Sequence, residues 1–227
     1  MRFLCSIPAL ALLAASSTGC KDAPATDKPA EAKAVETAAP AITATEADGF
    51  DGACKGPACI AKCDRLGRPD DCYEAGDAYR RGKDDVAQSL PSAIKYWEKA
   101  CAKKAREACF WLGRLYAEGD KGGVTKDVAK AIPLFERACD LGRGQACDDL
   151  SKLAERGEGM PQDHAKAVAL LAKGCSAQDY QEWTCRAFKK AVDAKDEEAV
   201  KAVAAWKTAC AAQDKAACKG LERADLK

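Results

Sequence analysis

Histidine and closely spaced cysteine pairs are almost absent from this chain. His164 is the only histidine, and none of the fourteen cysteines forms a C-x-x-C pair. Structural zinc sites combine cysteine and histidine at short spacing, and thioredoxin-like and haem-attachment motifs both contain C-x-x-C. The P-loop, the dinucleotide-binding G-x-G-x-x-G and the G-x-S-x-G elbow are missing as well. We therefore expect neither a metal nor a cofactor.

Neither sign of charge predominates, and aromatic residues are scarce. The chain has 36 basic and 35 acidic residues mixed along its length, with a formal net charge of +1. A nucleic-acid partner requires a sustained basic surface that displaces counterions from phosphates, so we expect no such partner. Only 6% of the residues are aromatic although 48% are hydrophobic, which predicts a core rich in alanine and leucine.

The first twenty residues are typical of an export signal. Arg2 precedes the apolar run "FLCSIPALALLAA", which is too short to span a bilayer, and "SSTG" leads to Cys20. Small residues followed by Gly19 and Cys20 resemble the lipobox of bacterial lipoproteins. The resemblance implies cleavage before Cys20 and a lipid chain on its sulfur, with ordinary signal cleavage nearby as the alternative. In lipoproteins of this kind an aspartate after the cysteine often retains the protein at the inner membrane. Here that residue is Lys21, which favours anchoring at the outer membrane, facing the periplasm.

The next segment contains almost nothing to bury. Residues 20–52 are mainly Ala, Pro, Thr and Glu, a composition typical of disordered linkers. About thirty flexible residues have a root-mean-square reach of roughly 30 Å, enough to hold a folded body clear of a lipid surface. We therefore predict a signal peptide at 1–19, a disordered tether at 20–52 and a cysteine-rich repeat domain at 53–227.

The repeat domain shows its period when segments are aligned on their cysteines. Four segments begin at Cys72, Cys109, Cys147 and Cys185, and a fifth, incomplete one begins at Cys218. The pattern of each of the four complete segments predicts two helices, A and B. In three segments a glycine suited to a helix end follows helix A: Gly82, Gly119 and Gly157. Helix B begins near residues that can accept hydrogen bonds from its free amides: Ser89, Asp127, Asp163 and Asp196.

Two columns of helix B predict close packing between helices. Eight residues before the closing cysteine, every segment has an alanine: Ala93, Ala131, Ala167 and Ala202. Four residues before it, every segment has a bulky side chain: Trp97, Phe135, Leu171 and Trp206. Each pair buries little alone and must stack on its neighbours. The expected fold is therefore all-α, an α/α solenoid of about four helix pairs.

The column pattern also predicts exceptions. The fourth segment is shorter and lacks the loop glycine, so we expect a tighter or irregular hairpin there, and the final half repeat suits a solubilising cap. His164 occupies a column that otherwise holds Leu90, Val128 and Ala199. We therefore expect it to be a partly buried helix residue.

The second segment resembles a known repeat family. Its motifs "LGRLYAEG", "KDVAKAI" and "ERACDLG" are similar to the Sel-1-like repeat, a relative of the tetratricopeptide repeat. The cysteines before "FWLG" and at the end of "ERAC" are similar to those of cysteine-rich Hcp-type proteins, which are exported solenoids. The resemblance implies a superhelix with a concave groove. It also implies, as an alternative function, a weak penicillin-binding or β-lactamase activity, because some Hcp-type proteins are described in that way.

The cysteines favour disulfides, for which two connectivities compete. Within segments the pairs would be 72–101, 109–139, 147–175 and 185–210, leaving four cysteines over. Across the turns between segments the pairs would be Cys63–Cys72, Cys101–Cys109, Cys139–Cys147, Cys175–Cys185 and Cys210–Cys218, with Cys54–Cys59 as the sixth. The second scheme uses all twelve cysteines after Cys20 and follows the more constant spacing of 8 to 10 residues. A tight turn between helices brings such residues within bonding reach.

The sequence contains one weak match to a catalytic motif. Ser92 to Lys95 fits S-x-x-K, but no S-D-N or K-T-G follows. Ser92 also falls in a surface column that holds Lys130, Lys166 and Lys201 in the other segments. We therefore assign no catalytic residue.

A binding surface is the remaining functional candidate. Positions two, five and nine after the cysteine share a face of helix A, and the candidate residues there are Glu74, Asp77, Arg81, Trp111, Arg114, Lys152 and Arg156. Trp111 is either an anchor for a ligand or a residue packed on a neighbouring helix. We expect a membrane-anchored scaffold whose partner is a periplasmic or outer-membrane protein, a peptide or a cell-wall component.

Overall fold

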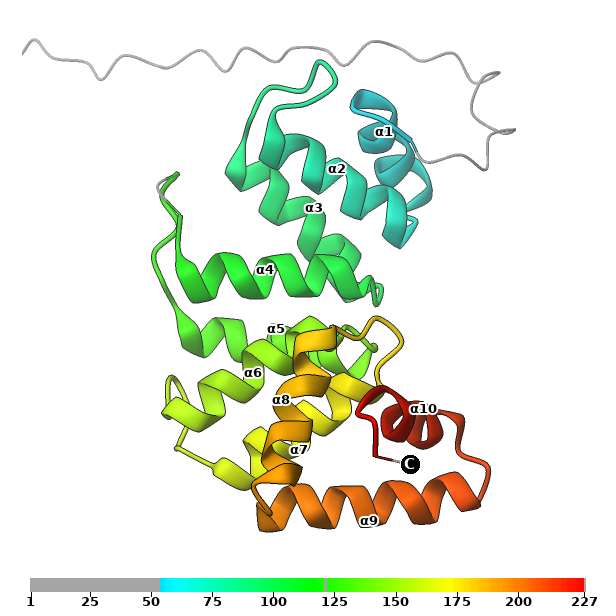
Figure 1. The fold of residues 1–227 in the computed structure, drawn as a ribbon. Helices are drawn as coiled ribbons and strands as arrows, with labels where there is room; N and C mark the ends of the chain where they lie inside the picture. Colours follow the sequence, from blue (N-terminus) through cyan, green and yellow to red (C-terminus); the bar gives the residue numbers. More distant parts are fainter. Residues whose placement is uncertain (1–53, 121, 227) are drawn as a thin grey trace, which may run out of the picture. The chain divides into compact units, whose positions relative to one another are not determined.

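The computed structural model describes residues 54–120 and 122–226, and these ranges contain ten α-helices and no β-strand (Figure 1). The helices are α1 (Pro57–Leu66), α2 (Pro69–Arg81), α3 (Leu90–Ala102), α4 (Arg106–Glu118), α5 (Val128–Asp140), α6 (Gly144–Arg156), α7 (His164–Ser176), α8 (Glu182–Asp193), α9 (Glu197–Ala211) and α10 (Lys215–Arg223). None of them is long and apolar enough to cross a membrane. The predicted signal peptide, Cys20 and tether lie outside the described residues.

Three antiparallel pairs form the regular part of the stack. Helix A packs on helix B in α2–α3, α4–α5 and α6–α7, and successive pairs contact each other through α3–α4 and α5–α6 (Figure 1). The first helix, α1, packs on α2. The predicted all-α solenoid of stacked helix pairs is therefore confirmed.

The ends of these helices follow local sequence signals. Ser89, Asp127, Asp163 and Asp196 are the N-cap residues of α3, α5, α7 and α9, and each side chain accepts a hydrogen bond from the backbone amide three residues on. Gly82, Gly119 and Gly157 follow α2, α4 and α6 with positive φ angles of 62°, 73° and 67°. Such caps satisfy backbone groups that a helix leaves unpaired.

A glycine on helix A complements the bulky residue on helix B. A Cβ on Gly76 would lie 2.4 Å from Cδ1 of Trp97, and a Cβ on Gly113 would lie 2.8 Å from Cδ1 of Phe135. Trp97 and Phe135 are each 1% exposed. These glycines stand four positions after the cysteine of their segments. The bulky residues of helix B therefore pack closely against helix A because the facing glycines have no side chain.

The fourth pair departs from the cysteine register. Ala93, Ala131 and Ala167 are buried as predicted, but Ala202 is half-buried and the fully buried alanine of α9 is Ala199. The alanine column is thus wrong for this pair. The cause is a change of neighbours, because α9 packs on α7 and α10 as well as on α8, and α10 also packs on α7.

The structure pairs the twelve described cysteines across turns. The pairs are Cys54–Cys59, Cys63–Cys72, Cys101–Cys109, Cys139–Cys147, Cys175–Cys185 and Cys210–Cys218, with Cα separations of 4.7 to 5.1 Å. Four of these bonds join the end of a helix B to the first turn of the next helix A, or of α10. A further bond joins α1 to α2 and another lies at the start of α1. Each therefore lies at or beside a short connection.

Candidate binding surface

The candidate residues lie on the first helices of the pairs. We call the face formed by the exposed and half-buried side chains of α2, α4 and α6 the A face. Helix amphipathicity explains the arrangement, because the opposite sides of these helices bury residues such as Ala75, Leu112 and Leu150. Glu74, Asp77 and Arg81 lie on α2, Trp111 and Arg114 on α4, and Lys152 and Arg156 on α6.

A cavity of about 480 Å³ opens on the A face between α4 and α6. Phe135, Leu153 and Ala117 supply apolar lining, and the charged lining residues are Arg114, Glu118, Lys126, Asp149, Lys152, Arg156 and Glu158, with Gln145 beside them. Its volume falls within the range of ligand-binding clefts. The A-face cavity thus brings together three of the seven predicted residues, Arg114, Lys152 and Arg156.

Most charges in this cavity are paired within the chain. The Arg114 guanidinium donates to Glu118 at 2.9 Å through Nε, and Arg156 Nε donates to Glu158 at 2.7 Å. Lys152 Nζ donates to Asp148 at 2.7 Å. Because the Arg114–Glu118 and Arg156–Glu158 pairs are at the surface, each contributes little to stability and can exchange its partner for a ligand group.

Two adjacent carboxylates on α6 differ in their surroundings. Asp148 is 3% exposed and accepts hydrogen bonds from Lys152 and from Trp183 Nε1, the latter at 3.2 Å. Asp149 lines the cavity, where burial raises its pKa although nearby Lys152 acts in the opposite direction. The cavity therefore contains a carboxyl group that accepts a proton more readily than an ordinary aspartate.

Trp111 lies between two arginines. The guanidinium carbons of Arg80 and Arg114 are 5.2 and 5.7 Å from the centre of its ring, and Phe110 packs against it edge-on at 5.5 Å. The indole is half-buried. Trp111 therefore packs on helix α2 through Arg80 and still exposes part of its ring on the A face.

The acidic candidates of α2 lie elsewhere. Glu74 and Asp77 line a separate depression of about 270 Å³ beside Cys54, Cys59 and Lys83. Burial raises the pKa of Glu74, and Asp77 adds to that effect. Asp77 also pairs with Arg81 at 2.8 Å. The α2 residues are thus not part of the A-face cavity.

One aromatic residue near the surface escaped the sequence analysis. Trp183 of α8 is 50% exposed, and its indole N–H is held by Asp148. It stands two positions before its cysteine, where the other segments have Asp70, Glu107 and Gln145. That outlier could have been recognised in the alignment of the segments.

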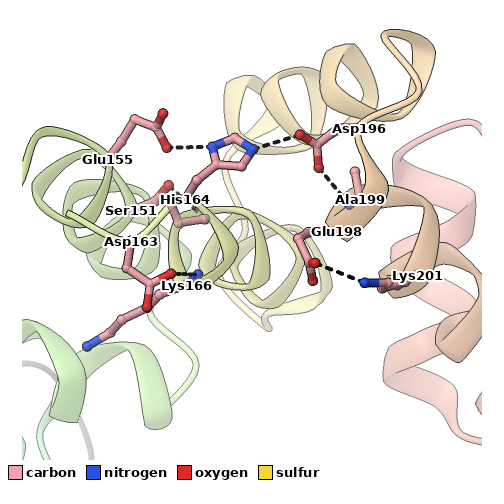
Figure 2. Close-up of polar contacts among 10 residues, drawn as sticks. Ser151, Glu155, Asp163, His164, Lys166, Asp196, Glu198, Ala199 and Lys201 are labelled. Atoms are coloured by element: carbon pink, nitrogen blue, oxygen red, sulfur yellow. Dashed lines mark hydrogen bonds and ion pairs between the residues drawn. The ribbon is translucent and has the colours of Figure 1, made fainter.

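His164 is not the partly buried residue that its column predicts. It is exposed, and Figure 2 shows its ring between two carboxylates, with Nδ1 2.9 Å from Glu155 and Nε2 2.6 Å from Asp196. The hydrogen bonds to Asp196 and then Glu155 raise the pKa of His164 to about 9. The expectation is wrong because the first residue of α7 points toward the start of α9 rather than toward the core.

Ser92 belongs to the beginning of α3. Its backbone amide donates to Ser89 Oγ at 3.4 Å, and its own Oγ accepts from Ser89 Oγ at 2.8 Å. These contacts belong to a helix cap. Within residues 54–120 and 122–226, no group of three cysteine, histidine or acidic side chains is arranged to hold a metal ion.

Several known proteins are similar to about half of this chain. Cytochrome c oxidase assembly factor 7 of Xenopus tropicalis is 31% identical over 119 residues, covering 50% of each chain, and the Mus musculus protein is 34% identical over 106 residues, covering 44% and 46%. Chitin synthase regulatory factor 1 of Schizosaccharomyces pombe is 30% identical over 109 residues, covering 48% of this chain and 24% of that protein. The chain spans about half the length of the assembly factors that it matches.

Solved structures show the same fold. A Sel1 repeat protein from Oxalobacter formigenes superposes with a TM-score of 0.53 at 24% identity, covering 69% of this chain and 63% of that one. The protective antigen c5321 of uropathogenic Escherichia coli, which displays an SLR fold, has a TM-score of 0.53 at 21% identity, covering 74% and 35%. The Sel1 repeat family model matches residues 69–104, 106–142 and 144–179, which contain the pairs α2–α3, α4–α5 and α6–α7. Each of these three helix pairs therefore matches one Sel1 repeat.

Proposed function

We propose that this protein is an exported, lipid-anchored scaffold that binds an envelope protein or a peptide segment of one through the A-face cavity. The observation that carries the proposal is the convergence of Arg114, Lys152 and Arg156 around one cavity with an apolar lining. A stack of Sel1 repeats favours protein binding as its general role. The anchor rests on the sequence around Cys20, and a cell-wall component is the other partner considered.

The chemistry of the cavity favours a protein segment. Its charges of both signs lie around apolar side chains, and an extended peptide offers backbone donors and acceptors together with apolar and charged side chains. The names of the similar proteins, an assembly factor and a regulatory factor, describe roles exerted on other proteins. That likeness supports a binding role for this chain without indicating its partner.

The test compares envelope proteins crosslinked to the wild-type chain with those crosslinked to two double variants. Arg114→Ala with Arg156→Ala removes two cavity cations whose acidic partners are at the surface. Lys95→Ala with Lys207→Ala removes two exposed cations on α3 and α9 and is the matched control. We expect the cavity variant, but not the control, to lose the crosslinked species. Equal recovery by both variants would overturn the assignment of the cavity.

A further inference from the structure

A pocket of about 400 Å³ lies between α10 and the segment that leads from α7 to α8. The residues that line it are Ser176, Ala177, Gln178, Lys215, Ala216, Lys219 and Arg223. Three of these side chains are cationic and none is a carboxylate. The A-face cavity differs, since three acidic residues there stand among four basic ones. We call this second site the α10 pocket.

Arg223 is held in place at one end of the pocket. Its Nη1 donates to the carbonyl oxygens of Cys175 and Ala177, at 3.0 and 2.6 Å, and its guanidinium carbon lies 3.8 Å from the centre of the Tyr180 ring. These contacts orient the cation before any ligand arrives. A preorganised charge loses less conformational entropy on binding than a mobile one.

Lys215 and Lys219 supply the other two charges. Both side chains are exposed, and neither forms an ion pair with any residue in the described part of the chain. Arg114, Lys152 and Arg156 of the A-face cavity, by contrast, are each paired with a carboxylate. The α10 pocket therefore has positive charge that the fold itself does not neutralise.

Further cations stand at the Gln178 edge of the pocket. Arg106 of α4 donates to Gln178 Oε1 at 3.3 Å, and Arg143, just before α6, pairs with the neighbouring Asp179. Glu107 offsets Arg106, with which it pairs at 2.8 Å. The helix α10 itself contains three cations and one carboxylate, Glu222, and is capped by Asp214, so the excess of positive charge is the one carried by α10.

The spacing of the α10 cations indicates what they fit. Lys215, Lys219 and Arg223 follow at intervals of four residues, which on an α-helix places them about 6 Å apart along the axis. Side chains on one face of an extended peptide recur about every 6.6 Å. Three acidic residues that alternate with other residues in an extended segment therefore match the three cations in number and spacing.

We propose that the α10 pocket binds an acidic segment of a protein partner, with carboxylates on alternate residues of an extended chain. The pocket shares no lining residue with the A-face cavity. This proposal therefore does not rest on the proposed function of that cavity, and either can fail alone.

The test uses a fluorescein-labelled Glu-Ala-Glu-Ala-Glu peptide and the full chain with its disulfides intact. Fluorescence anisotropy measures binding to the wild type, to Lys215→Gln with Lys219→Gln, and to a control with Lys95→Gln and Lys83→Gln. We expect the α10 variant to bind about three- to tenfold more weakly, as the loss of two surface charge pairs predicts. The control should stay within about twofold of the wild type. Arg223 is left unchanged because it also holds the end of α7.

Several outcomes would overturn the proposal. One is equal binding by the α10 variant and the control, with circular dichroism showing both folded. Another is equal affinity for a Gln-Ala-Gln-Ala-Gln peptide. A third is that the wild type binds inorganic phosphate, phosphatidylglycerol vesicles or an oligothymidylate more tightly than the acidic peptide, and that the α10 variant loses this binding. That result would assign the pocket to a different anion.

Discussion

His164 and Asp196 join the third helix pair to the fourth. The ring nitrogen Nε2 of His164 lies 2.6 Å from one carboxylate oxygen of Asp196, whose other oxygen accepts from the backbone amide of Ala199 (Figure 2). One side chain therefore caps α9 and bonds to the first residue of α7. The hydrogen bond from His164 also lowers the pKa of Asp196.

We expect the stability of the protein to fall as the pH rises from 6.5 to 9. The folded protein holds the pKa of His164 at about 9, above the ordinary 6.5. A raised pKa means that the contribution is fully present below pH 6.5 and is lost as the pH passes through 9. Exposed pairs of this kind contribute about 0.2 to 1 kcal/mol each. Thermal unfolding across this range, compared with His164→Gln, measures the effect.

NMR gives an independent check of the same bridge. The chain has one histidine, so its imidazole signal reports His164 alone. Titration near 9 supports the bridge, whereas a midpoint near 6.5 in the wild type would contradict it. The variant should show less change in stability between pH 6.5 and 9 than the wild type.

Gly76→Ala should destabilise the protein. The added Cβ would lie 2.4 Å from Trp97 Cδ1, in a region where the indole is 1% exposed. Overpacking of this kind costs about 1 to 3 kcal/mol, although alanine recovers about 1 kcal/mol of helix propensity. Chemical unfolding should show a net loss of up to about 2 kcal/mol. As a control, the double variant Gly76→Ala with Trp97→Phe should lose less stability than the two single variants lose in sum. Strict additivity of the two losses would argue against the contact.

Non-reducing peptide mapping should recover Cys139 linked to Cys147. Their Cα atoms are 4.9 Å apart across the turn between α5 and α6. Replacing both cysteines by alanine should cost about 2 to 3 kcal/mol, because a closed loop of about nine residues restricts the unfolded chain. A peptide linking Cys109 to Cys139 would instead support bonds within the segments.

Cys20→Ser should move the protein from the membrane fraction to the soluble fraction of its host. The sequence before Cys20 resembles a lipobox, and that resemblance implies lipid attachment to the Cys20 sulfur. Metabolic labelling with a radioactive fatty acid measures the modification directly. Cys5→Ser, within the predicted signal peptide, is the matched control, and labelling of Cys20→Ser at the wild-type level would contradict the anchor.

The sequence by itself determined the helix pairs and their boundaries. Ser89, Asp127, Asp163 and Asp196 cap helices because their side chains reach amides only three residues away. Interactions of that kind depend on a few neighbouring residues. The stacking of the pairs also follows from a repeated pattern, since equivalent positions meet equivalent neighbours.

The tertiary structure alone decided the features that join distant segments. His164 meets Asp196 across 32 residues, and Trp183 meets Asp148 across 35. The fourth pair loses its register because α10 returns to pack on α7. The four-residue spacing of the α10 cations is visible in the sequence, but only the structure places them in a pocket beside the α7–α8 connection. Composition counts charges, whereas the fold decides which charges find a partner.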